Sequence, residues 1–143
     1  MSTEENKAKV RRNIEEAFNK GNLAVADEII AANYVLHAPG QEFKGPVGFK
    51  QYGTMMRTGF PDFHMTIEDM VADGDNVACR FTVRGTHKGD LMGIAPTGKQ
   101  VTITGIVISR FAGGKEVEAW ASPDMLAMMQ QLGVVPPMGQ GGG

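Results

Sequence analysis

The chain has 143 residues, with 14 basic and 16 acidic side chains and a formal net charge of -2. This near balance argues against the strongly basic surface that nucleic acid binding requires. The length predicts a single domain over residues 1–135, large enough to bury a core around a small cavity. A flexible, glycine-rich tail is expected over residues 136–143.

The sequence also indicates the compartment in which the protein works. Its only cysteine, Cys79, excludes an internal disulfide and is typical of a reducing cytoplasm. Residues 1–12 lack the apolar core of a signal peptide, and no apolar run is long enough to span a bilayer. We therefore expect a cytoplasmic protein with no membrane partner. Cys79 falls inside an alternating pattern, which predicts a small buried side chain and not a nucleophile.

Three helices are expected in the first half of the chain. Apolar side chains recur there at helical spacing, and Ser2 with Glu5 forms a candidate capping box at the start. Pro46 is typical of the first turn of a helix, where its missing N–H does no harm. The expected helices span residues 2–20, 23–32 and 45–59, and a short strand spans residues 34–37.

The apolar pattern then changes to a period of two, which is typical of strands. Asp73-Gly74 and Gly113-Gly114 separate strand-like runs in the manner of hairpin turns. Within the second run, Cys79 and Phe81 alternate with polar neighbours and are expected to face the core. The expected strands span residues 63–72, 76–87, 101–111 and 115–120, and a final helix spans residues 123–132.

This order of elements is typical of an α+β fold and not of strictly alternating α/β folds. We expect a cone-shaped, curved antiparallel β-sheet packed against three N-terminal helices, with a short C-terminal helix. A curved sheet closed by helices can enclose a small-molecule cavity. The helix over residues 45–59 carries Tyr52 and Met56 on its apolar side, and we expect both side chains to line that cavity.

Polar residues at strand ends are the candidates for chemistry. His37, His87 and Asp124 each close or follow a predicted strand, and strand ends of one curved sheet can converge at a cavity mouth. Each residue also has a structural interpretation. The histidines can be hydrogen-bonded structural residues, and Asp124 can cap the final helix. From the residues alone, both interpretations stay open.

Several common kinds of site are not indicated. The sequence contains no phosphate-binding, dinucleotide-binding or zinc protease motif, and its histidines lack metal-ligand spacing. We therefore expect no metal and no other cofactor. Arg110 can pair with Glu118 or Glu116 across the sheet, which is its structural interpretation.

The second half of the chain carries the motifs of a known family. Gly85-Thr86-His87-Lys88-Gly89 is followed by the run GIAPTGK over residues 93–99 and by Glu118-x-Trp120-x-x-x-Asp124. Further matches are Phe60-Pro61-Asp62, the run DGDNVA over residues 73–78, Arg110-Phe111 and Gln131-Leu132-Gly133. In this order the motifs resemble the SnoaL-like polyketide (ester) cyclases of the nuclear-transport-factor-like superfamily, from about residue 10 to residue 133.

The resemblance implies both a fold and a chemistry. The fold is the α+β cone, and the chemistry is a cofactor-free intramolecular aldol-type cyclisation or a related isomerisation. The family's acid/base is the aspartate after the tryptophan, which carries over onto Asp124 and places Trp120 beside it. His37, His87, Arg110 and Trp120 would then be pocket side chains. A homodimer or a higher homo-oligomer is implied as well.

Two other functions remain open for this cone. Ile106, Val107 and Ile108 are apolar where a polyketide would need hydrogen-bond donors, so a small hydrophobic or polyketide-like substrate is expected. An epoxide hydrolase or a ketosteroid-isomerase-like enzyme could use the same fold, because a fold does not determine a reaction. A non-catalytic small-ligand-binding module is the third hypothesis.

Overall fold

Six strands form one sheet, in the order β2-β1-β6-β5-β4-β3, in a computed structural model that describes residues 2–135. All neighbouring strands are antiparallel except β1 and β6, which run parallel. The strands are β1 (Ile30–Ala38), β2 (Gln41–Lys44), β3 (His64–Asp73), β4 (Asn76–Thr86), β5 (Gln100–Ala112) and β6 (Lys115–Pro123). The α+β prediction is confirmed. The sheet is mixed because no hairpin joins β1 to β6, so no turn forces them to be antiparallel.

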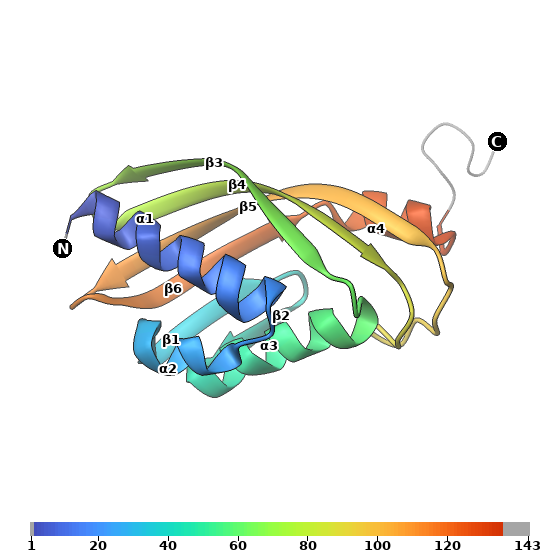
Figure 1. Ribbon diagram of the computed structural model, residues 1–143, viewed down its shortest axis with the longest axis horizontal. Helices are drawn as coiled ribbons and strands as arrows, with labels where there is room; N and C mark the ends of the chain where they lie inside the picture. Colours follow the sequence, from blue (N-terminus) through green and yellow to red (C-terminus); the bar gives the residue numbers. More distant parts are fainter. Residues whose placement is uncertain (1, 136–143) are drawn as a thin grey trace.

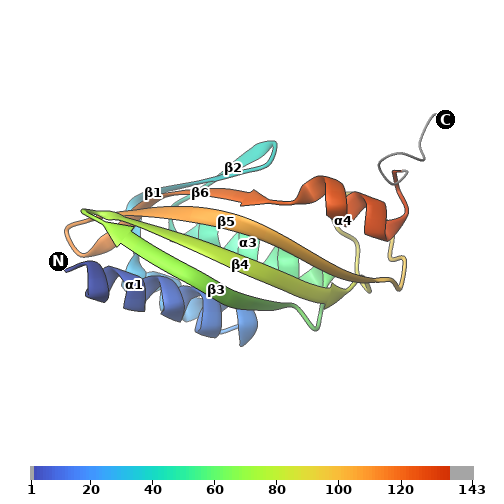
Figure 2. The same cartoon turned by 90° about the horizontal axis from the view of Figure 1, so that it is seen from above.

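The helices that precede β3 cover one face of this sheet, and the last helix lies at one end of it (Figure 1). They are α1 (Thr3–Arg12), α2 (Ala26–Ile29), α3 (Gly45–Gly59) and α4 (Met125–Leu132), with a π-helical segment η1 (Asn13–Asn19) and a 3-10 turn η2 (Leu23–Val25). Figure 2 shows α3 behind the curved strands and α4 beyond the end of β6. The helix α1 packs against β3 and β4, and α3 packs against β1 and β2. The space between the sheet and the helices is the interior of the cone.

The first helix begins as expected but changes its geometry. The Ser2 hydroxyl caps α1 by accepting a hydrogen bond from Glu5 N at 3.1 Å. The chain then continues as the π-helical η1, a rare and wider form of helix. Arg57 of α3 satisfies the last carbonyls of η1, since its Nη1 lies 2.9 Å from both Phe18 O and Asn19 O. The terminus of this widened helix is therefore tied to α3.

Other boundaries also differ from the sequence prediction: β1 and β6 are longer than expected, and α4 begins two residues later. The helix expected over residues 23–32 is shorter, because Ile30 already begins β1. The strand β2 was not predicted at all. It follows the turn at Gly40, whose φ of 76° lies in the left-handed region that glycine adopts readily. The helix before β1 ends early because Ile30 pairs with Glu116 in the sheet and is buried there. This burial outweighs the weak helical pattern of the sequence at Ile30.

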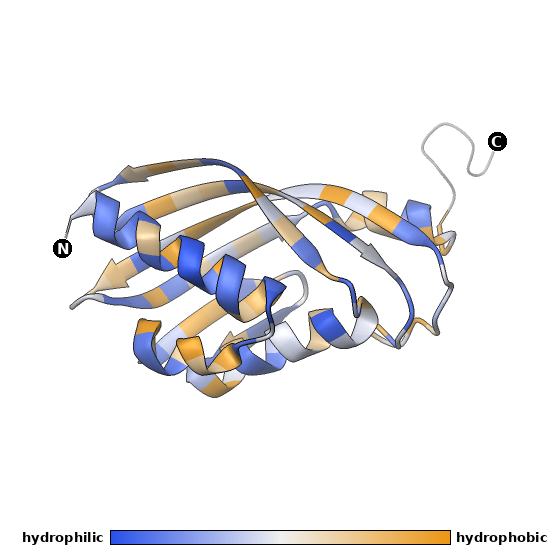
Figure 3. Cartoon of the chain, in the orientation of Figure 1, coloured by the Kyte–Doolittle hydropathy of each residue, from blue (hydrophilic) through white to orange (hydrophobic). Residues whose placement is uncertain are grey.

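The strands bury their apolar residues and expose their polar ones in alternation, as the sequence pattern predicts. Val77, Cys79, Phe81 and Val83 of β4 are all buried in the core, as predicted. Burial raises the pKa of the Cys79 thiol to about 11, so the thiol stays protonated at neutral pH. Figure 3 shows apolar and polar residues alternating along the long strands. One face of the sheet therefore supplies the interior, and the other face is exposed.

Several motif residues have a structural role. A Cβ on Gly85 would lie 2.8 Å from Phe60 Cβ, and one on Gly89 would lie 2.0 Å from Thr58 O. Only glycine allows such close approach of the segments at these positions. The glycines of the Gly85–Gly89 motif therefore let the end of β4 and the following loop pack against the end of α3.

Asp62 joins the same two parts of the chain. Its carboxylate accepts hydrogen bonds from Thr86 N at 2.7 Å and from Thr86 Oγ1 at 2.8 Å. These bonds hold the pKa of Asp62 below its usual value. The motifs at residues 60–62 and 85–89 thus fasten α3 to β4.

Two expectations about the ends and the environment of the chain remain. The predicted tail, residues 136–143, lies outside the described residues. None of the helices described is long and apolar enough to cross a membrane.

Candidate functional site

The interior of the cone contains an apolar cavity at the end next to α4. Its volume is about 50 Å³, and it extends between α3, α4 and the turn from β1 to β2. Tyr52 and Met56, the two residues of α3 that were expected in a pocket, both line it. The methionines Met55, Met92 and Met125 contribute as well. Because methionine side chains adapt to irregular shapes, this end can change its shape around an apolar ligand.

A second cavity of about 60 Å³ lies deeper, beneath the β5–β6 hairpin. Four side chains line both cavities, so the two spaces adjoin: Phe18, Tyr52, Met65 and Phe81. The deeper cavity differs in its chemistry, because Asn13, Tyr34, Ser109 and Glu116 bring polar atoms to its wall. The interior is therefore apolar at the α4 end, and a few polar groups join an otherwise apolar wall at the hairpin end.

Glu116 faces this interior because of a β-bulge. In the register of β5 and β6, Arg110 lies opposite Glu118 and Phe111 lies opposite Glu116, so Val117 is an extra residue. A bulge of this kind reverses the expected alternation on one side of the extra residue. Glu116 is consequently only 4% exposed and faces inward together with Phe111. Glu118, two residues later, faces outward.

Burial dominates the electrostatics of Glu116. Loss of solvation raises the pKa of its carboxyl group from the usual 4.5 to about 7. Hydrogen bonds from Ser109, Asn13 and Tyr34 oppose this shift, and Asn13 Nδ2 lies 3.1 Å from Glu116 Oε1. Burial also raises the pKa of Tyr34 well above its usual value, and the negative charge of Glu116 adds to this effect. Near neutral pH, Glu116 therefore exists in both protonation states.

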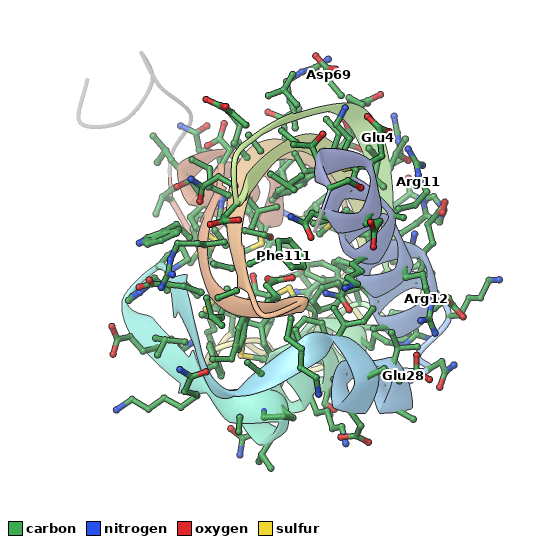
Figure 4. The ribbon with its side chains drawn as sticks, turned by 90° about the vertical axis from the view of Figure 1, so that its left-hand side faces the viewer. Glu4, Arg11, Arg12, Glu28, Asp69 and Phe111 are labelled. Atoms are coloured by element: carbon green, nitrogen blue, oxygen red, sulfur yellow. The ribbon has the colours of Figure 1, made fainter. Side chains whose placement is uncertain are left out.

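Figure 4 views the molecule along the cone, from the hairpin end. Phe111 lies in the interior between the sheet and α1, whereas Arg11, Arg12 and Asp69 lie at the periphery. The peripheral charges pair with one another: Arg12 Nε lies 2.6 Å from Glu16 Oε2. The side chains that act on the Glu116 carboxyl group are instead Ser109, Asn13 and Tyr34.

His37, Arg110 and Trp120 lie together, but on the outer face of the sheet. His37 Nε2 lies 2.7 Å from Glu118 Oε2, and Arg110 Nη2 lies 3.1 Å from Glu118 Oε1. The His37 ring stacks on Trp120, with ring centroids 5.6 Å apart. The hydrogen bond to Glu118 raises the pKa of His37, and Glu42 adds to this shift. These three residues do not line the interior cavities. Arg110 forms the ion pair with Glu118 that was its structural interpretation.

His87 is fully buried, but it is not among the residues that line either cavity. Its Nδ1 accepts a hydrogen bond from Thr97 N at 3.2 Å, which places the proton of a neutral ring on Nε2. Its backbone N–H donates to Lys99 O at 2.9 Å, and its ring packs against Phe60. His87 thus fixes the loop between β4 and β5 to the core.

Asp124 adopts the helix-capping geometry. Its Oδ1 accepts a hydrogen bond from Ala127 N at 3.0 Å at the start of α4. The side chain is exposed, in a groove on the outer face that Arg80, Thr104 and Ser122 also line. Its two neighbours, Pro123 and Met125, line the apolar cavity. Asp124 is therefore next to the cavity wall, and its carboxylate is directed away from the cavity.

The apolar residues of β5 divide between the two faces. Val107 lines the deeper cavity, but Ile106 and Ile108 are exposed on the outer face. Of the three, only Val107 therefore faces the interior, and it brings no hydrogen-bond donor to it. Residues 2–135 contain no group of three His, Cys, Asp or Glu side chains placed to hold a metal ion.

Sequence reasoning missed the polar residues of the deeper cavity. Strict alternation places Glu116 on the same side as Glu118, so the pattern suggests an exposed partner for Arg110. The bulge at Val117 depends on the pairing of β5 with β6, and no local signal marks it. Asn13 does fall on the apolar stripe of the first helix, three residues after Val10. A polar residue at such a position was the available signal.

Comparisons with known proteins agree with this architecture. A family model described as SnoaL-like polyketide cyclase matches residues 8–132. The aklanonic acid methyl ester cyclase DnrD of Streptomyces peucetius is 29% identical over 138 residues, which cover 92% of this chain and 93% of the relative. DauD of Streptomyces sp. (strain C5), a cyclase of the same name, is also 29% identical, over 92% of this chain and 84% of that protein.

Solved structures of related proteins have the same fold. IdmH of Streptomyces antibioticus, for which a polyketide cyclase activity has been suggested, is 33% identical with a TM-score of 0.76, over 90% of this chain and 98% of that one. AclR of Streptomyces galilaeus, for which a hydroxylase activity has been suggested, is 29% identical with a TM-score of 0.82, over 94% of this chain and 100% of that one.

The raised pKa of Glu116 predicts a pH dependence of stability. Between about pH 4.5 and pH 7 the folded state keeps a proton that the unfolded state has lost, so stability falls as the pH rises. The free energy of unfolding should therefore decrease by about 1.4 kcal/mol per pH unit through this group. Glu116→Gln is neutral at every pH and lacks this contribution.

Urea unfolding of the wild type and of Glu116→Gln at several pH values measures the effect. We expect the stability of the variant relative to the wild type to rise by about 3 kcal/mol between pH 4.5 and pH 7, and to stay constant above that. A difference that does not change with pH would contradict the assignment of a raised pKa to Glu116.

Proposed function

We propose that this chain, which belongs to the SnoaL-like polyketide cyclase family, is an enzyme that moves protons on a small apolar or polyketide-like substrate without a cofactor. The apolar cavity at the α4 end supports this proposal, because it can shield a reactive enolate from water. The relatives named as cyclases support the reaction class.

The proposed reaction is an intramolecular aldol-type cyclisation. A base removes a proton from a carbon that lies between carbonyl groups, and the resulting enolate attacks a second carbonyl carbon. The new alkoxide then takes a proton from the protonated base, so that no proton is gained or lost overall. A carboxylate near the cavity is sufficient for this task, because the neighbouring carbonyl groups acidify the carbon.

Asp124 is the proposed acid/base at the α4 end. Its neighbours Pro123 and Met125 line the cavity, so a change of its side-chain rotamer is the shortest route to a bound substrate. This change requires the carboxylate to leave Ala127 N, and helix capping of this kind contributes about 1 kcal/mol. Binding of a substrate can compensate for such a cost. Asp124 would therefore cap α4 in the free protein and act on the substrate when one is bound.

A non-catalytic ligand-binding module is the second candidate. The exposed, helix-capping position of Asp124 favours it, because this carboxylate does not face the cavity. An isomerase or an epoxide hydrolase would use the same cavity and the same proton transfer on a different substrate. Turnover measurements separate these alternatives.

Asp124→Asn tests the proposed acid/base without removing the helix cap, since Asn caps helices as well as Asp does. With aklanonic acid methyl ester as the substrate, we expect turnover at least about 100-fold below the wild type. The midpoint of thermal unfolding should stay close to that of the wild type. Asp124→Ala, the control for capping, should lose turnover and also about 1 kcal/mol of stability.

Equal turnover by the wild type and Asp124→Asn would rule out Asp124 as the acid/base. If neither protein turns the ester over but both bind it, the ligand-binding module is the better account.

We also propose that the outer face of the sheet forms a homodimer. Ile106, Ile108 and Trp120 are exposed on this face, and the register places Ile108 directly opposite Trp120. Arg110 and Glu118 carry opposite charges beside this apolar patch. A patch with both signs of charge at its border can pair with its own copy across a two-fold axis.

Ile108→Glu should therefore yield a monomer, because it buries a charge at the centre of the proposed interface. Light scattering coupled to size-exclusion chromatography measures the mass. Val47→Glu is the matched control, since Val47 is an exposed valine on α3 and should leave the mass unchanged. A wild type that is already monomeric would refute the dimer.

A further inference from the structure

The polar groups at the hairpin end of the interior have no role in the proton transfer assigned to Asp124. We propose that they bind one hydroxyl or enol group of a ligand, which donates a hydrogen bond to Asn13 Oδ1 and accepts one from the protonated carboxyl group of Glu116. The inference rests on the proposed function in one respect, namely that a ligand enters the cone. It adds which chemical group of that ligand is recognised, and where.

Asn13 provides the acceptor. The residue is only 4% exposed, and its Nδ2 already donates to Glu116 Oε1 at 3.1 Å. Its Oδ1 is buried and has no hydrogen-bond partner among residues 2–135. Unpaired polar atoms in a protein interior are rare, because they lose their hydration without compensation. Asn6, His87 and Gln130 also have buried atoms without a partner, but only Asn13 among these residues lines an interior cavity, so its acceptor matches a donor that comes from a ligand.

Glu116 provides the donor when it is protonated. Glu116 lines the same cavity, and its pKa of about 7 means that the neutral acid is well populated at physiological pH. A neutral acid in an apolar site can donate a strong hydrogen bond, as a group that is already in position. A hydroxyl group is both donor and acceptor, so it can satisfy Asn13 and Glu116 at once.

The charges around the cavity favour a neutral ligand group over an ion. Among the described residues that line this cavity, Glu116 is the only acidic or basic side chain, and Tyr34 and Tyr52 are the other titratable ones. Burial raises the pKa of Tyr52 to about 12, and that of Tyr34 is raised as well, so both remain neutral. An anionic ligand would meet the Glu116 carboxylate with no cation to compensate it.

The size and position of the cavity fit this role. Its volume of about 60 Å³ is roughly twice the share of one water molecule in the liquid, which admits a hydroxyl group and the carbon that carries it. The rest of the ligand would extend past Tyr52 and Met65 into the apolar cavity. Asn13 is the first residue of the π-helical η1, and π-helical turns occur frequently at functional sites.

A pair of inert compounds tests the recognition without turnover. 1-Phenylethanol and isopropylbenzene have the same shape and differ by a hydroxyl in place of a methyl group. NMR titration at about pH 6 gives the dissociation constant of each compound. The quantity compared is the dissociation constant of isopropylbenzene divided by that of 1-phenylethanol. We expect this ratio to fall about tenfold in Asn13→Leu, which removes the acceptor. Met125→Leu, at the apolar end, should change the affinity for both compounds alike.

If Asn13→Leu does not fold, Glu116→Gln provides the test. In the wild type the ratio should change at least about threefold between pH 6 and pH 8.5, as Glu116 loses its proton, and in Glu116→Gln it should stay constant. Binding of neither compound, or a ratio that neither the Asn13 substitution nor the pH alters, would overturn the inference. Because no turnover is measured, this failure is distinct from a failure of the proposed reaction.

Discussion

A carboxyl group inside an apolar interior must be either neutral or compensated by partners, and this constraint shapes the candidate site. The cone encloses Glu116, which is 4% exposed and pairs with Phe111 in the β5–β6 hairpin. Ser109, Asn13 and Tyr34 stabilise its charged form, but burial outweighs them and the pKa rises to about 7. A single extra residue in β6 is what brings the carboxyl group inside. The π-helical turn then places Asn13 against it.

The motifs that resemble the family mostly build the cone. Asp62 binds the end of β4, and Gly85 and Gly89 allow the close contact with α3. Gln131 fixes α4 to β5 through both the N–H and the carbonyl of Thr102, at 2.7 and 2.8 Å. Residues with these roles identify a fold more reliably than a reaction. The residues that distinguish this interior, Asn13 and Glu116, lie outside the matched motifs.

The sequence predicted those features that depend on local pattern. The alternation in β4 identified the buried face correctly, and the apolar side of α3 identified Tyr52 and Met56 as residues of the cavity wall. It could not predict which face the residues after the hairpin would take. Regular alternation puts Glu116 outside, and only the pairing of β5 with β6 reveals the bulge. His37 was expected at a cavity mouth for a related reason, because the end of a strand does not reveal which face of the sheet a side chain joins. Trp120 was expected in the pocket from the family resemblance, which does not reveal the face either.

The most direct test of a proton-exchanging carboxyl group in the interior is to observe its titration. In protein labelled with ¹³C at the glutamate carboxyl groups, the resonance of Glu116 can be assigned by its loss in Glu116→Gln. The structure predicts a titration midpoint near pH 7 for this resonance. A midpoint at the usual 4.5 of an exposed glutamate would contradict the account, because the carboxyl group would then be solvated or fully compensated in its charged form.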